Sequence, residues 1–138
     1  MRRPIRKEFV VLLFALAAAA CGDRAATPTS PTVTTTIVTE TFSGTLPPNG
    51  ATTWPFTTAS SGTVTATLTT VAPEGRALGL SLGTWNGSAC QIIIANDRAV
   101  QGTVVTGSVA TAGSLCARVY DATGLAGSAD YLVTVVHP

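Results

Sequence analysis

Histidine, cysteine and charged side chains, which could perform acid–base or metal chemistry, are sparse in this 138-residue chain. The only histidine, His137, is the penultimate residue, and chain ends are usually poorly ordered. A Ser-His-Asp or Cys-His centre needs a histidine that is held firmly beside its nucleophile. The cysteines at 21, 90 and 116 form no CxxC pair, and no HxxxH spacing exists, so the usual zinc motifs are absent. We therefore expect no catalytic residue, no cofactor and no metal ion, and predict that the protein is not an enzyme.

Three aspartates follow or end segments with strand-like patterns: Asp97, Asp121 and Asp130. Calcium takes about six to eight oxygen ligands, and no DxDxD cluster gathers them in this chain. We expect solvated turn residues instead. Asp121 is predicted to begin a turn and to accept hydrogen bonds from backbone amides of the loop at 122–124.

Tryptophan could provide a contact surface for a sugar or a peptide. Trp54 shares strand parity with Phe56, which favours a place in the core. Trp85 lies one position out of phase with the Leu-x-Leu-x-Leu run at 78–82 and directly precedes an Asn-Gly turn. We therefore predict that Trp85 is at least partly exposed, and it is the one aromatic candidate for a ligand contact.

Charge excludes one class of partner. Four of the eight basic residues lie in the first eight positions, and the rest of the chain has four arginines against six acidic residues, a net charge of −2. Nucleic-acid binding needs a basic surface that neutralises several phosphates. We expect no nucleic-acid partner.

The N-terminus has the pattern of a signal peptide. Residues 2–7 hold four positive charges, and Phe9–Ala20 is an apolar run of twelve residues. A helix needs roughly 17–25 apolar residues to cross a bilayer, so this run is too short for a permanent span. Residues 1–20 are predicted to be a signal peptide.

The end of this run, Ala18-Ala19-Ala20-Cys21, resembles the bacterial lipobox, although the family usually has leucine where Ala18 stands. In that family the cysteine receives a diacylglycerol and becomes the first residue of the mature protein. The resemblance implies a membrane partner through acyl chains on Cys21, and a location in the bacterial cell envelope, facing the periplasm or the exterior. The alternative is a plain secretory signal cut after Ala20, which leaves Cys21 as a free thiol.

Cys90 and Cys116 are expected to form a structural disulfide. With Cys21 acylated they are the two remaining cysteines, both lie in predicted strands, and the export signal delivers the chain to an oxidising compartment. The alternative is a pair of buried free cysteines, because the strand pattern alone does not place their Cα atoms within the roughly 4.4–6.8 Å that a bridge requires.

The composition divides the mature chain into two parts. Residues 21–36 are predicted to hold the cysteine that the lipobox resemblance marks for lipidation and a Thr/Pro-rich tether, and residues 37–138 are predicted to form one domain. The candidate strands of this domain are Ile37–Leu46, Thr53–Thr57, Gly62–Val71, Ala77–Trp85, Cys90–Ala95, Gly102–Val109, Ser114–Asp121 and Tyr131–His137.

Alternation with a period of two carries these assignments. In the third strand Val64, Ala66 and Leu68 fall on one face, and threonines fall on the other. No stretch holds a helical period over the ten or so residues that a helix would need. About eight short strands in about 100 residues predict an all-β fold, an antiparallel, jelly-roll-like β-sandwich.

The order of these segments resembles bacterial pre-peptidase C-terminal (PPC) domains. The segments that carry the resemblance are Trp54-Pro55-Phe56, Gly62–Leu68, Leu78–Leu82 running into Asn86-Gly87, Gly113–Asp121 and Tyr131–Val135. Members of that family are β-sandwiches that accompany secreted exoenzymes as non-catalytic modules, and some bind collagen or calcium. The resemblance implies that residues 37–138 form one PPC-like β-sandwich domain, a binding module for a polysaccharide, peptide or protein ligand. The alternative is a structural or accessory subunit of an envelope or secretion complex, engaged through a sheet edge.

Overall fold

A computed structural model describes residues 30, 32 and 34–138. The predicted signal peptide, the predicted lipidation site Cys21 and most of the predicted tether lie outside these residues. The described part of the chain contains no helix with the length and apolar character needed to cross a membrane. Its strands are β1 (Val38–Leu46), β2 (Ala51–Thr58), β3 (Gly62–Ala72), β4 (Leu78–Trp85), β5 (Cys90–Ala99), β6 (Val104–Val109), β7 (Gly113–Tyr120) and β8 (Ala129–His137).

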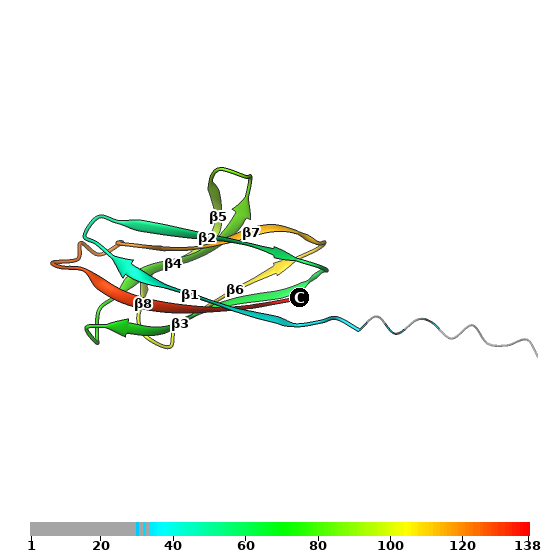
Figure 1. Cartoon of the computed structure of the whole chain (residues 1–138), viewed down its shortest axis with the longest axis horizontal. Helices are drawn as coiled ribbons and strands as arrows, with labels where there is room; N and C mark the ends of the chain where they lie inside the picture. The colour runs from blue at the N-terminus through cyan, green and yellow to red at the C-terminus, as the bar shows by residue number, and fades with distance from the viewer. Residues whose placement is uncertain (1–29, 31, 33) are drawn as a thin grey trace, which may run out of the picture. The chain divides into compact units, whose positions relative to one another are not determined.

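The strands form two four-stranded antiparallel sheets that pack face to face (Figure 1). The first sheet has the order β1-β8-β3-β6, and the second has the order β2-β7-β4-β5. Four of the pairings are nested, because β1 pairs with β8, β2 with β7, β3 with β6 and β4 with β5. This arrangement is that of a chain folded in half at the β4–β5 turn and then rolled up, which is the jelly roll. The predicted fold class is confirmed.

The core lies between the two sheets and is filled by the inward-facing side chains, which are every second residue along the strands. In β3, Val64, Ala66 and Leu68 are buried, as the alternation predicts. Phe56 is buried in β2, and Trp54 stacks on Phe42 with ring centroids 5.4 Å apart. The prediction that these two aromatics belong to the core is confirmed for Phe56, whereas Trp54 lies at its border.

Strand β4 is buried on both faces over most of its length. Its leucines face the core, while Gly79, Ser81 and Gly83 face outward, where only small side chains leave room for neighbours. An added Cβ on Gly79 would lie 2.4 Å from the Tyr120 ring, so this ring covers the glycine. The outer face of β4 therefore carries a second, smaller packing layer.

The C-terminus corrects one expectation. His137 was predicted to lie at a poorly ordered chain end, but it belongs to β8 and is only 2% exposed. Its Nε2 lies 3.1 Å from the Glu40 carboxylate on β1, and its ring packs against Phe56 at 5.1 Å. The reason is that β8 is an inner strand of the first sheet, so the end of the chain is held between β1 and β3.

Candidate functional site

Strand β5 is one of the two outer strands of the second sheet, and the β4–β5 hairpin projects from the sandwich (Figure 1). Three successive isoleucines lie on it, and Ile92, Ile93 and Ile94 are 44%, 74% and 40% exposed. Side chains alternate along a strand, so three adjacent apolar residues cannot all reach the core. The ladder with β4 shifts between Ile92 and Ile94, which leaves Ile93 as the extra residue of a bulge. These three side chains are here called the isoleucine patch.

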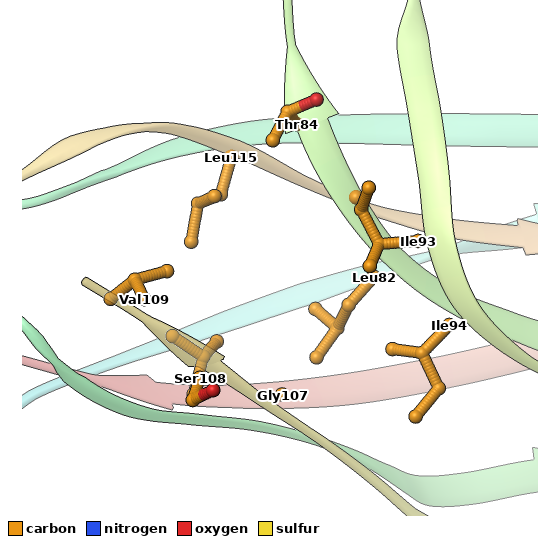
Figure 2. Close-up of a pocket in the computed structure, with 10 residues that line it drawn as sticks. Leu82, Thr84, Ile93, Ile94, Gly107, Ser108, Val109 and Leu115 are labelled. Atoms are coloured by element: carbon orange, nitrogen blue, oxygen red, sulfur yellow. The ribbon is translucent and has the colours of Figure 1, made fainter. Parts of the chain in front are cut away.

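A shallow apolar groove adjoins the isoleucine patch, where the two sheets part between β5 and β6. Its volume is about 110 Å³. Figure 2 shows Leu82, Val109 and Leu115 around the gap, with Ile93 and Ile94 reaching it from β5. The remaining lining residues are Val64, Gly83, Thr84, Gly107 and Ser108.

The chemistry of this groove is aliphatic. The ten described residues that line it include no charged and no aromatic side chain, and two hydroxyl groups, those of Thr84 and Ser108, are its polar side-chain groups. Covering such a surface is favourable because it removes apolar area from water. The surface offers few groups for hydrogen bonds with a polar ligand. The groove is suited to uncharged aliphatic groups.

A disulfide fixes the start of β5 and thereby positions the isoleucine patch. Cys90 on β5 and Cys116 on β7 are bonded, with their Cα atoms 5.8 Å apart. These strands flank β4, and strands two apart in a flat sheet are separated by roughly 9.5 Å. The hairpin therefore bends over the outer face of β4 at this point. The predicted disulfide is confirmed, and Cys116 is fully buried beneath the bend.

Gly83 permits this close approach. It pairs with Cys116 on one side and with Ile92 on the other, and its outward face lies under the β5 backbone. An added Cβ would lie 2.1 Å from the carbonyl oxygen of Gln91, far inside van der Waals contact. A residue without a Cβ is required where two backbones come this close.

Trp85, the predicted ligand contact, ends β4 and is partly exposed. It pairs with Cys90 across the hairpin, just before a turn in which the Asn86 side chain accepts hydrogen bonds from the amides of Ser88 and Ala89. Trp85 is not among the residues that line the groove. Its role in ligand binding stays a prediction.

A polar cluster occupies the outer face at the other end of β4. The Tyr120 hydroxyl donates a hydrogen bond to the Asp97 carboxylate, and the Arg118 guanidinium lies over the Tyr120 ring at 5.8 Å from its centroid. Burial of the phenol, together with this hydrogen bond and the nearby negative charge, raises the pKa of Tyr120 from 10.0 to about 12. The Tyr120–Asp97 contact thus ties β7 to the far end of β5.

Of the three aspartates that were expected in turns, Asp121 begins one, whereas Asp97 lies in β5 and Asp130 in β8. Asp121 accepts hydrogen bonds from the amides of Thr123, Gly124 and Leu125, which confirms the predicted turn, and from the amide of Asn49 as well. Asp130 accepts a hydrogen bond from Thr45, and Asp97 one from Tyr120. Within the residues that the structure describes, no three His, Cys, Asp or Glu side chains form a group that could hold a metal ion.

Comparison with protein-family models and with curated proteins finds no match to this chain. The site therefore has to be interpreted from its own geometry. The isoleucine patch and the groove were not predicted from the sequence, although one signal was available. The run Ile92-Ile93-Ile94 breaks the apolar–polar alternation, and because neighbouring side chains of a strand point to opposite faces, it brings apolar side chains to the surface.

Proposed function

We propose that this protein is a non-catalytic, lipid-anchored lipoprotein of the bacterial cell envelope, whose PPC-like β-sandwich is a protein-interaction module. The observation that carries the proposal is the isoleucine patch on an unpaired sheet edge, beside an uncharged aliphatic groove. Exposed apolar surface of this kind marks interaction sites in soluble proteins. An exposed strand edge also offers unpaired backbone groups to another strand.

A protein ligand fits this surface better than a polysaccharide does. A sugar-binding surface needs hydrogen-bonding groups and an aromatic face, whereas the groove is lined mainly by leucine, isoleucine and valine. Trp85 is the aromatic candidate nearest to β5 along the hairpin, and it is not a lining residue. The same surface serves the alternative role of a structural or accessory subunit in an envelope or secretion complex, because such a subunit would also be engaged through a sheet edge.

The proposed anchor rests on the basic start, the apolar run and the lipobox-like Ala18–Cys21. Replacing Cys21 with serine removes the thiol that would be acylated. We expect Cys21→Ser to move the exported protein from the detergent-extracted membrane fraction to the soluble fraction. Unchanged fractionation would refute the lipid anchor and would leave the interaction surface to be tested on its own.

The interaction surface is tested by site-specific photo-cross-linking in intact cells. A photoreactive amino acid in place of Ile93, the most exposed residue of the patch, should give discrete protein adducts. The matched control is Ile37, which is 61% exposed and directly precedes β1, an edge strand of the other sheet. We expect no adducts at position 37. If the probe at position 93 also gives no protein adducts, the proposed interaction module is refuted.

A further inference from the structure

We propose that the partner of the isoleucine patch is a second copy of this chain, in a two-fold dimer whose Ile92–Ile94 segments lie antiparallel to each other. The proposal rests on the function proposed above and names the partner for the same surface. An isologous interface of this kind uses one patch twice, so the patch must complement itself.

The four sheet edges of the described chain differ in how well they are protected against pairing. Strand β1 carries the charge of Glu40, and β2 carries Pro55, which has no N–H to offer. Strand β6 is short, with six residues, and so offers few unpaired backbone groups. Strand β5 has ten, and from Cys90 to Asn96 it contains neither a proline nor a charge. Strand β5 therefore has the longest edge without a charge or a proline, although the bulge at Ile93 interrupts it, so a second strand would pair with the residues on either side of Ile93.

The surface also determines the chemistry of what covers it. Unpaired backbone groups beside aliphatic side chains and an uncharged groove call for an extended segment with aliphatic side chains and no charge. The chain itself presents such a segment, because Ile93 is 74% exposed and its neighbours are each at least 40% exposed. Every copy therefore carries both the surface and the segment that fits it.

Charge favours the antiparallel arrangement. If the two-fold axis passes through any residue from Ile92 to Ile94, Asp97 of one copy faces a position between 87 and 91 of the other, and Arg98 faces one between 86 and 90. All of these positions are uncharged, so no like charges meet. Residues 34–138 carry five acidic and three basic side chains, and this small net charge gives weak repulsion between copies.

The test is sedimentation velocity of the exported Cys21→Ser protein over a wide concentration range, because this variant needs no detergent. We expect a concentration-dependent dimer. Ile93→Lys places two charges at the proposed interface and removes two apolar side chains, so it should weaken the dimer about a hundredfold or more. Ile37→Lys, the same change at an exposed isoleucine before β1, should leave the dimer intact. Circular dichroism and the melting temperature should show that both variants are folded, since both side chains are exposed.

Two outcomes would overturn the dimer: a protein that stays monomeric at all concentrations, or a dimer that Ile93→Lys does not weaken. The cross-linking experiment separates this failure from failure of the proposed function. Adducts at position 93 with a different protein, from a monomeric chain, would refute self-association and support the interaction module. A monomer without adducts would refute both.

Discussion

At the scale of single residues, the Asp121 side chain links two loops, because its carboxylate accepts hydrogen bonds from the backbone amides of four residues in these loops. The amide of Asn49 contributes most, and together the amides lower the pKa of Asp121 below its ordinary value of 3.8. A carboxyl whose pKa is lowered by folding stabilises the folded state above its unfolded pKa. That contribution is lost as the pH falls through the folded pKa.

We therefore expect Asp121→Ala to lower the melting temperature at neutral pH, and the difference from the wild type to shrink as the pH falls below about 4. Thermal melts followed by circular dichroism across this range measure it. Asp121→Asn keeps one acceptor oxygen without the charge, so its loss at neutral pH should be smaller. Equal melting temperatures of Asp121→Ala and the wild type at neutral pH would contradict the assignment of Asp121 as the link between the two loops.

Gly83 makes a second prediction at this scale, from geometry alone. Gly83→Ala places a Cβ 2.1 Å from a backbone oxygen, so β5 must move away from β4. Forcing additional atoms into a packed site typically costs about 1–3 kcal/mol of the free energy of unfolding. Gly113→Ala is the matched control, because an added Cβ there meets nothing within 4 Å, and we expect it to change stability by less than about 0.5 kcal/mol. Urea unfolding measures the free energy of unfolding of both variants. An equally small loss in both would show that β5 can move away from β4 without a cost in stability.

At the scale of the elements, the Cys90–Cys116 disulfide closes a loop with a sequence separation of 26 and holds the hairpin across β4. The chain-entropy model gives roughly 3.5 kcal/mol for a loop of this length. We expect the double variant Cys90→Ala, Cys116→Ala to lose about this much of its free energy of unfolding, measured in denaturant. The reduced wild-type protein is the control that separates the covalent constraint from packing of the sulfur atoms. A reduced protein as stable as the oxidised one would show that the bond adds no constraint.

Alternation predicted all eight strands but not all of their ends. Strand β5 was expected to end at Ala95 and runs to Ala99, because Asn96, Asp97 and Arg98 lie on an exposed edge where polar side chains stay in water. Similarly, β2 begins at Ala51 and β8 at Ala129, each two residues earlier than predicted. These residues gain their partners from strands distant in sequence, which a local pattern does not contain.

The candidate site was less accessible to prediction than the fold. The groove forms where β5 of one sheet lies beside β6 of the other, and only the jelly-roll order brings these strands together at an open edge. The disulfide could be predicted from the number of cysteines and the export signal, but the bend over Gly83 that makes it possible could not. Composition and local pattern thus gave the strands and the covalent link, while the apolar surface required the register between strands.

At the scale of the whole molecule, the nested pairing brings the first and the last strand of the sandwich together. Val38 pairs with His137, so the first and last strands of the sandwich are hydrogen-bonded neighbours. The carbonyl oxygen of Pro138 accepts a hydrogen bond from the amide of Ala59, and Pro138 is fully buried. The C-terminus therefore closes the first sheet against the β2–β3 connection.

Removing His137 and Pro138 tests this closure. The deletion takes away a ring packed against Phe56, the contact with Glu40 and one backbone hydrogen bond, which together are expected to cost about 2–4 kcal/mol of the free energy of unfolding. Denaturant unfolding of the truncated and full-length Cys21→Ser proteins measures the loss. Adding a short Gly-Ser extension after Pro138 is the control, because it changes the terminus but keeps both residues. If the truncated chain unfolds at the same denaturant concentration as the full-length chain, the last two residues contribute nothing to the closure of the sandwich, despite their burial.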